Sequence, residues 1–435
     1  MKTTEMLNVD ELEVGMYVAQ LDRPWLETSF LFQGFYIRDN DEIQEIRSYC
    51  EHVYITCDSL PAEPVSEEKT TVTKSDSETA NGKATKSKGF SLRSLFSKKE
   101  TQEPVDGFRQ TNIYYKEATS LKAEINTANN VHKQAVVTVQ GVMEKLCNTG
   151  SLEIDKLESA VTPMVDSVLR NPAALACLVR MQKKDNYLYH HSLASSVWAT
   201  ILGRQIGLGR DDLDVIALGA MLLDVGKTQV PDEILNKPEK LDKEEKALMR
   251  RHVQFGLDIL DKSGDVDSRV LDMVAHHHER YNGTGYPARL KGNDIPVFGR
   301  IAGIVDAYDA MITPRVYAEL QSSYDALRRL RVLADVEFQA EIVDQFTKAI
   351  GAFPTGTLVE LNTGEIGIVT KQNLIRRLRP EVMIIMGANK QMLENFRIAD
   401  LNEETVVQDS THSLWIERGL APGEFDIDPV EFYLS

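Results

Sequence analysis

The chain has 435 residues and carries 66 acidic against 49 basic side chains, for a formal net charge of −17 at pH 7. Its length predicts two or three folded units, and its acidic balance argues against a DNA-binding protein, because phosphate backbones are bound by clustered Lys and Arg. The four cysteines are scattered and too few for a disulfide scaffold, and no apolar stretch is long enough to cross a bilayer. We therefore expect a cytoplasmic protein without a transmembrane segment.

Residues 1–58 carry short β-type runs, such as GMYVAQL and HVYITC, which Asp, Asn, Pro and Gly separate. They predict a small β-rich N-terminal domain, in which the aromatic residues of DRPWLETSFLFQGFYI are interpreted as core and not as a ligand-binding face. Residues 59–109 consist mainly of Ser, Thr, Lys, Glu and Pro and predict a disordered linker. Within it, KSKGFSLRSLFSKK mixes cations with apolar side chains, so contact with an anionic membrane or a partner is the alternative to a solvated linker.

The middle of the chain has apolar residues at helical spacing, as in the run from Val131 to Leu146. Residues 110–164 predict a helical lead-in, and residues 165–352 predict a nearly all-helical domain. Residues 353–435 contain the β-type runs TLVELNTGEIGIVT and EVMIIMG, which predict a small C-terminal β extension and tail. The expected fold class is mainly α, with a small β-rich part at each end.

Six of the nine histidines fall in one stretch of the helical region, with Asp224 among them and Asp306 after them. Neutral imidazole nitrogens and carboxylate oxygens together suit first-row transition metals. A bridging carboxylate also allows two ions to lie about 3.5–4 Å apart and act on a phosphate ester. The pair His277 and His278, together with Asp224, is therefore predicted to bind metal.

Five segments resemble, in order and spacing, the motifs of HD-GYP proteins, which are bacterial phosphodiesterases of the second messenger cyclic di-GMP. These segments are DNYLYHHS, LLDVGKTQVPDEILNKPEKLDKEE, MRRHVQFG, HHERYNGTGYPARLKG and RIAGIVDAYDAMIT. The N-terminal DELEVGMYVAQLDRPWLETSFLFQGF also resembles the small domain often found ahead of HD-GYP modules. The resemblance implies that residues 165–352 form a helical bundle of the HD superfamily that acts as a metal-dependent phosphohydrolase.

Carried over position by position, the resemblance implies six metal ligands, which are His191, Asp224, His252, His277, His278 and Asp306. The cofactor implied is a divalent transition metal, Fe or Mn, with one or two ions in the chain. Lys227 and Asp224 are the catalytic residues implied, and the Lys227 ammonium, one helical turn from Asp224, would stabilise charge on the phosphate. The substrate-binding residues implied are Arg315 and, in the GTGYP turn, Gly285, Tyr286 and Pro287.

Four positions depart from the family pattern. Leu223 stands where the family has the histidine of its His-Asp pair, and an aliphatic side chain cannot bind a metal, so a second ion should bind more weakly. Asn282 replaces an aspartate and Ala318 a cation, so a lower substrate affinity is expected. Tyr187 stands where some relatives have the glutamate that accompanies a third metal, so a trinuclear centre is not expected.

These residues leave more than one function open. The first is hydrolysis of cyclic di-GMP to pGpG or GMP, weakened by Leu223, which the retained ligands and Lys227 favour. The alternative, which Leu223 favours, is an inactive member that serves as a cyclic di-GMP receptor or binds a diguanylate cyclase or another signalling protein through its GYP surface. A nucleotide phosphohydrolase of the wider HD superfamily, acting on another substrate, is the third.

Overall fold

The structure is a computed structural model that describes residues 4–25, 28, 30, 34–37, 40–56, 113–180, 187–313, 320–373, 376–403, 405–407, 410–412, 414–429 and 431–434. The chain divides into two compact units, Met1–Lys88 with Leu374–Arg377 and Gly89–Asn373 with Leu378–Ser435, which we describe separately. The predicted linker, residues 59–109, lies outside the described residues, as do Arg315 and Ala318.

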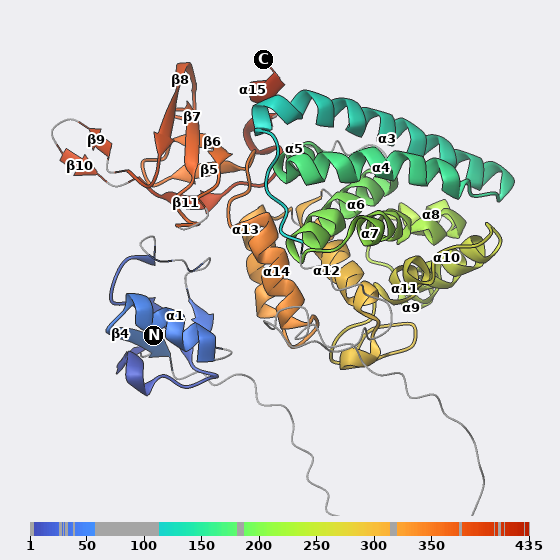
Figure 1. Cartoon of the computed structure of the whole chain (residues 1–435), viewed down its shortest axis with the longest axis horizontal. Helices are drawn as coiled ribbons and strands as arrows, with labels where there is room; N and C mark the ends of the chain where they lie inside the picture. Colours follow the sequence, from blue (N-terminus) through green and yellow to red (C-terminus); the bar gives the residue numbers. More distant parts are fainter. Residues whose placement is uncertain are drawn as a thin grey trace, which may run out of the picture. The chain divides into compact units, whose positions relative to one another are not determined.

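The N-terminal unit, blue in Figure 1, contains an antiparallel sheet in the order β1–β4–β2–β3. Its elements are β1 (Thr4–Asn8), η1 (Val9–Glu11), β2 (Tyr17–Leu21), β3 (Phe35–Tyr36), α1 (Asn40–Tyr49) and β4 (His52–Thr56). Trp25, Phe30 and Phe35 are buried, and the ring centroids of Phe30 and Phe35 lie 5.0 Å apart, so these aromatic residues form core. Helix α1 was not predicted, although it buries Ile43 and Ile46, one turn apart.

The larger unit is mainly helical, as Figure 1 shows in green to orange. Its first helices are α3 (Leu121–Thr149), α4 (Ile154–Arg170), α5 (Pro172–Val179), α6 (Tyr187–Gln205), α7 (Arg210–Leu222), η3 (Val225–Gln229) and α8 (Asp232–Leu235). They are followed by α9 (Lys243–Arg250), α10 (His252–Asp261), α11 (Ser268–His276), η4 (Gly292–Asp294), α12 (Val297–Ile312), α13 (Ser323–Val332) and α14 (Ala340–Ile350).

The core of the helical bundle lies where α6, α12 and α14 meet. Trp198 on α6, Tyr308 on α12 and Phe346 on α14 are fully buried. The ring centroid of Tyr308 lies 5.4 Å from that of Trp198 and 5.0 Å from that of Phe346. Burial of three large aromatic rings supplies much apolar area and favours edge-to-face contacts. This core fixes the positions of α6 and α12, which both contribute to the histidine cluster.

A second β region follows the helices, as predicted from the change in residue pattern after residue 353. It is a five-stranded antiparallel sheet in the order β11–β5–β6–β7–β8, with a separate hairpin of β9 and β10. The bounds are β5 (Leu358–Leu361), β6 (Ile366–Lys371), β7 (Glu381–Met386), β8 (Met392–Asp400), β9 (Thr405–Val407), β10 (Ser410–His412), β11 (Ile416–Gly419), η5 (Glu424–Asp426) and α15 (Glu431–Leu434). The predicted fold class, mainly α with a small β-rich part at each end, is confirmed.

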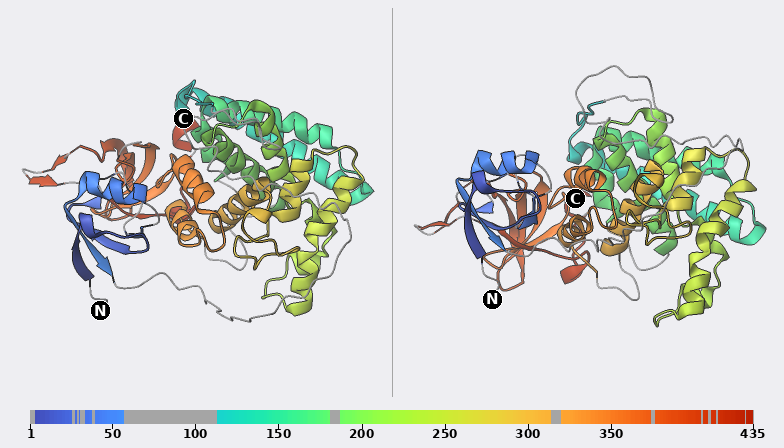
Figure 2. Two further views of the ribbon diagram at one scale, coloured as in Figure 1. Left: turned by 60° about the horizontal axis from the view of Figure 1, so that its bottom comes forward. Right: turned by 90° about the horizontal axis from the view of Figure 1, so that it is seen from below.

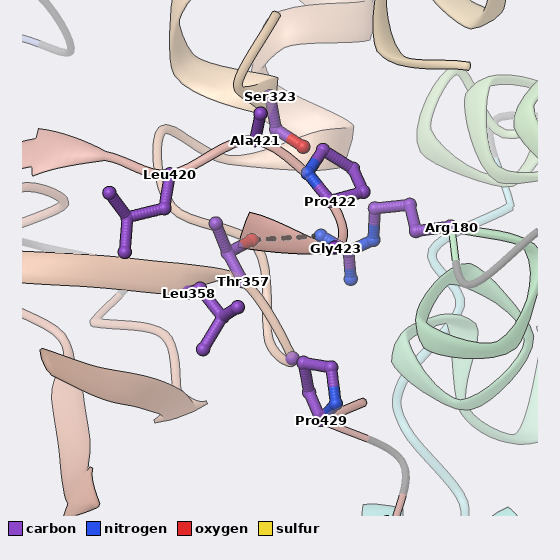
Figure 3. A pocket seen from close by; sticks show the side chains of 10 residues that line it. Arg180, Ser323, Thr357, Leu358, Leu420, Ala421, Pro422, Gly423 and Pro429 are labelled. Carbon is purple, nitrogen blue, oxygen red and sulfur yellow. Dashed lines mark hydrogen bonds between the residues drawn. The ribbon is translucent and has the colours of Figure 1, made fainter. Parts of the chain in front are cut away.

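Arg180 ties this sheet to the helices. The side chain, buried at the end of α5, donates to Thr357 Oγ1 at 2.9 Å and to the backbone carbonyl of Thr355. Figure 3 shows the small cavity beside it, about 20 Å³, which Pro422 and Pro429 help to line. Such a volume holds about one water molecule. Figure 2 shows the orange helices α13 and α14 beside the same sheet.

None of the helices in the described ranges is both long enough and apolar enough to span a membrane.

Candidate metal centre

The structure brings the six predicted ligands together from separate elements of the bundle. They lie on α6, at the junction of α7 and η3, at the start of α10, at the end of α11 and on α12. Two groups form, and in each the potential ligand atoms lie within 4.8 Å of one another. The four-residue group is Asp224, His252, His277 and His278, and the three-residue group is His191, Asp224 and Asp306. Asp224 belongs to both groups.

Gly226 allows this junction to form. A Cβ atom at Gly226 would lie 1.9 Å from the backbone oxygen of His252 and 2.4 Å from the nitrogen of Gly256. Only a residue without a side chain therefore lets η3 press against α10. This close approach brings Asp224, just before η3, to His252, the first residue of α10.

In the four-residue group, unprotonated nitrogens face one another. His252 Nδ1 donates to the Met249 carbonyl at 2.7 Å, and His277 Nδ1 donates to the Val274 carbonyl at 2.9 Å. Each ring therefore carries its proton on Nδ1, and the two Nε2 atoms lie 3.3 Å apart. Burial lowers the pKa of His277 to about 4, so a neutral imidazole with a free lone pair is the favoured form.

Asp224 adds an unpartnered oxygen to this group. Its Oδ1 is buried, has no hydrogen-bond donor among the described residues, and lies 3.5 Å from His252 Nε2 and 3.9 Å from His277 Nε2. Burial opposes ionisation of Asp224, but the charges of Lys227 and His191 outweigh it and hold the pKa of this carboxyl well below its usual range. A buried, unpaired carboxylate oxygen beside two imidazole lone pairs fits a divalent transition metal.

The three-residue group is richer in negative charge. His191 Nε2 lies 3.1 Å from Asp306 Oδ1 and 3.4 Å from Asp224 Oδ2, while its Nδ1 lies 2.6 Å from Asp309 Oδ2. Burial alone would lower the pKa of His191, but the bonds to Asp306 and Asp309 outweigh it and raise this pKa to about 9. An ion that binds His191 Nε2 would therefore displace a proton.

Leu223 and Lys227 lie on either side of Asp224 in the sequence. The Lys227 ammonium contacts Asp224 Oδ2 at 2.6 Å, so the predicted proximity is present. Leu223 follows the last residue of α7 and is only 1% exposed, so a buried hydrocarbon side chain precedes Asp224 in the sequence. The three-residue group thus contains one imidazole, where the four-residue group contains three.

The GTGYP turn, residues 283–287, is held against this centre by Glu279. The Glu279 carboxylate accepts hydrogen bonds from the backbone nitrogens of residues 288, 289 and 290 at 2.7, 3.0 and 3.0 Å. A Cβ atom at Gly285 would lie 2.4 Å from the backbone nitrogen of Arg280, so this position requires glycine.

Asn282 Oδ1 accepts hydrogen bonds from the backbone nitrogen and the hydroxyl of Thr284, which an aspartate could also do. The Asn282 departure therefore leaves the turn intact.

An aromatic stack covers His278. The ring of Tyr286 is stacked on the His278 imidazole, with centroids 4.6 Å apart, and the Arg250 guanidinium lies 4.8 Å from the Tyr286 centroid. Pro287 follows Tyr286 and is exposed. Tyr286 and His278 were predicted site residues, whereas Arg250 was missed.

Sequence reasoning also missed Asp309, Trp198 and Gly226. Asp309 could have been found from its spacing, because the segment DAYD places it one helical turn after Asp306 and on the same face of α12. Nothing in the sequence marks Trp198, whose indole N–H donates to Asp309 Oδ1 at 2.9 Å. The predicted phosphate ligand Arg315 lies outside the described residues, so its role stays a prediction.

Three known family models match parts of the chain. Residues 173–342 match the HD domain, residues 6–157 match a domain of unknown function, and residues 358–408 match the KOW domain associated with HD domain. A cyclic di-GMP phosphodiesterase of Pseudomonas aeruginosa is 34% identical over 282 residues, which cover 65% of this chain and 68% of the relative. With this coverage and the HD domain match, the chain belongs to the HD-GYP family of HD-domain proteins.

Other relatives align over shorter stretches. The 3′3′-cGAMP-specific phosphodiesterase 2 of Vibrio cholerae is 36% identical over 155 residues, 35% of this chain and 30% of the relative. A cyclic di-GMP phosphodiesterase response regulator of Xanthomonas campestris is 34% identical over 167 residues, 37% of this chain and 44% of the relative. The chain thus spans less than half the length of these two. Among solved structures, an HDG"Y"P protein from Bdellovibrio bacteriovorus gives a TM-score of 0.44 at 16% identity, covering 79% of this chain and 98% of that one.

Proposed function

We propose that the chain is a metal-dependent phosphodiesterase that hydrolyses cyclic di-GMP to linear pGpG or GMP. The observation that carries this proposal is Asp224, whose two carboxylate oxygens face two separate groups of potential ligands. A carboxylate shared in this way is the arrangement that two-ion phosphoesterase centres use. The Pseudomonas aeruginosa relative, named as a cyclic di-GMP phosphodiesterase, supports the same substrate.

The chain's donor set fits one or two divalent ions, with Fe(II) or Mn(II) proposed. His252, His277, His278 and Asp224 would hold the first, and His191, Asp224 and Asp306 the second. When bound, such ions supply a Lewis acid for the phosphate and lower the pKa of a water molecule.

The remaining roles belong to the chain's own side chains. Lys227 would neutralise charge on the phosphate from its place beside Asp224, and Arg315 would bind a phosphate oxygen. Tyr286, held between His278 and the Arg250 guanidinium, would line the substrate mouth beside Gly285 and Pro287. Burial of the ligand side chains excludes bulk water and strengthens these charge interactions.

A second function rests on Leu223. Because a buried aliphatic side chain replaces one ligand, the three-residue group retains a single imidazole, and an ion bound there would be held more weakly. A chain that loses this ion would keep the four-residue group and the GTGYP turn. It would then serve as a receptor for cyclic di-GMP, or as a module that binds a diguanylate cyclase or another signalling protein through the GYP surface.

One assay separates these functions. The full chain, loaded with Mn(II) or Fe(II), is incubated with cyclic di-GMP, and with 3′3′-cGAMP in a parallel sample, beside a Leu223→His variant. We expect the wild type to produce pGpG or GMP from cyclic di-GMP, and the variant to do so faster. If the wild type is inert and the variant cleaves, the receptor function replaces the enzyme. If neither chain cleaves or binds cyclic di-GMP, the enzyme and receptor functions both fail and the protein-interaction module is left.

A further inference from the structure

A carboxylate outside the predicted ligand set lies directly behind His191. Asp309, on α12, is 1% exposed, and its Oδ2 lies 2.6 Å from His191 Nδ1. Because Nδ1 donates its proton to this carboxylate, Nε2 is the nitrogen left to face Asp224 and Asp306. Asp309 therefore selects which nitrogen of His191 is offered to an ion.

Asp309 is itself held in place by two further bonds. The indole nitrogen of Trp198 donates to its Oδ1 at 2.9 Å, and Thr313 Oγ1 donates to its Oδ2 at 3.2 Å. The Trp198 ring packs edge-to-face against Tyr308 in the core of the bundle. A chain of contacts thus runs from the rigid core through Asp309 to His191.

Two of the three histidines in the four-residue group have a different support. His252 and His277 each donate their Nδ1 proton to a neutral backbone carbonyl. An imidazole whose N–H is bound by a carboxylate is a stronger electron donor at its other nitrogen than one bound by a carbonyl. Of His191, His252 and His277, only His191 has its N–H bound by a carboxylate. His191 belongs to the three-residue group, which contains a single imidazole.

We propose that Asp309 is the positioning residue that keeps the three-residue group a metal site despite Leu223, by orienting His191 and strengthening its Nε2 as a ligand. This inference rests on the metal centre of the proposed function. It adds a residue that should affect the ion in the three-residue group more than the ion in the four-residue group. Asp309 belongs to neither ligand group. It acts through His191.

Titration of the metal-free full chain with Mn(II), with free Mn(II) measured by electron paramagnetic resonance, tests the inference without an activity assay. We expect two binding steps in the wild type. In Asp309→Asn, which keeps the shape and removes the charge, the weaker step should move about 10–100-fold to higher concentration while the tighter step stays. Asp212→Asn is the matched control, because Asp212 is a buried aspartate of the same bundle that pairs with Arg269 and should leave both steps unchanged.

Three results would overturn the inference. The first is an Asp309→Asn titration identical to that of the wild type. The second is an equal weakening of both binding steps, which would mean a general structural role. The third is a single binding step in the wild type that the variant leaves unchanged. Failure of the proposed function is a separate result, because it is read from the absence of cleavage by the Mn(II)-loaded wild type.

Trp198 provides an independent readout. The chain has three tryptophans, so its ¹⁵N-labelled indole spectrum is simple, and the Trp198→Phe variant assigns the Trp198 resonance. During titration with diamagnetic Zn(II), this resonance should shift with the second equivalent, because the ion at His191 changes the charge that Asp309 shares with the indole. A shift with the first equivalent, or no shift, contradicts the inference.

Discussion

His252 and His277 face each other Nε2 to Nε2 across 3.3 Å, and both Nδ1 protons are donated to backbone carbonyls. With the unpartnered Oδ1 of Asp224, three lone-pair donors converge on one buried point. Such a convergence is repulsive until a cation shares it. The tighter of the two proposed ion sites depends on that relationship.

Metal removal should destabilise the helical unit. An ion that binds only the folded chain stabilises it by about 2.7 kcal/mol when its concentration is a hundred times Kd. Chelation of the purified protein should therefore lower the midpoint of thermal unfolding by several degrees, and Mn(II) should restore it. Mg(II), which prefers oxygen ligands, serves as the control and should restore it poorly. A midpoint that chelation does not change would contradict this prediction.

His277→Ala should weaken binding of the tighter ion. The substitution removes a direct ligand, so the loss should exceed the roughly 10–100-fold that a lost outer contact costs. The matched control is His276→Ala, because His276 is its chain neighbour and is absent from both ligand groups, with Nδ1 bonded to the Asp272 carbonyl. Isothermal titration with Mn(II) measures both variants. Equal losses of Mn(II) affinity in the two variants would show that the substitutions act by disturbing the end of α11 and not by removing a ligand.

Gly226→Ala should break the junction of η3 with α10. The added Cβ atom would lie 1.9 Å from the backbone oxygen of His252, so the two elements must move apart, at a cost of about 3 kcal/mol or more in stability. The movement would also draw Asp224 away from His252 and reduce Mn(II) affinity. Gly141→Ala is the control, because nothing lies within 4 Å of a Cβ atom at that helical position and stability should rise by about 0.5–1 kcal/mol.

Arg250→Ala should weaken cyclic di-GMP binding without affecting the ions. The guanidinium lies over Tyr286, which covers His278, so it is placed to bind an anionic substrate beside the centre. We expect Kd for cyclic di-GMP to rise about 5–30-fold, the equivalent of about 1–2 kcal/mol. Arg251→Ala is a close control, because its guanidinium lies at the same 4.8 Å from the ring of Phe255 instead. Equal effects of both variants, or a change in Mn(II) affinity, would contradict this role.

Glu124 should make the folding stability of the helical bundle depend on pH. Its carboxylate accepts from Arg170 at 2.7 and 2.9 Å and from Ser167 at 2.9 Å, and these bonds outweigh burial and lower its pKa below 4.5. The stabilisation is therefore present above pH 4.5 and is lost as pH falls through the lower pKa of the folded state.

Glu124→Gln measures that contribution. Because Arg170 is 37% exposed and partly screened, we expect the variant to lose about 1–3 kcal/mol at pH 7, with the difference from wild type shrinking as pH falls below 4.5. Denaturant unfolding at several pH values measures the stability difference. The control is Glu153→Gln, which removes surface ion pairs with Lys145 and Lys156. A difference that stays constant down to pH 3 would contradict the assignment to Glu124.

Some of the site could be predicted because its chemistry is visible in the sequence. Histidines such as His277 and His278 are rare, adjacent and placed in recognisable motifs, so their convergence on Asp224 could be expected from the order of residues alone. The β-rich parts at both ends were likewise visible as alternating runs. The helix α1 was missed, because its short apolar pattern around Ile43 and Ile46 is interrupted by charged residues in a β-rich context.

The supporting contacts could not be predicted, because they depend on tertiary distance. Asp309 meets His191 across 118 positions of sequence, and Trp198 meets Asp309 across 111. No local pattern encodes which of several buried carboxylates will lie behind a given imidazole. The stack of Arg250 on Tyr286 is similar, because one residue ends α9 and the other lies in the GTGYP turn.

The most direct test of a centre shared by Asp224 is the metal content of the wild type and of Asp224→Ala, purified in parallel and saturated with Mn(II). Because Asp224 is the one residue common to both ligand groups among the described residues, its removal should disrupt both sites at once. We predict up to two ions per wild-type chain and none retained by the variant after gel filtration, with the helical content unchanged. A variant that keeps the metal content of the wild type would contradict a centre built on Asp224.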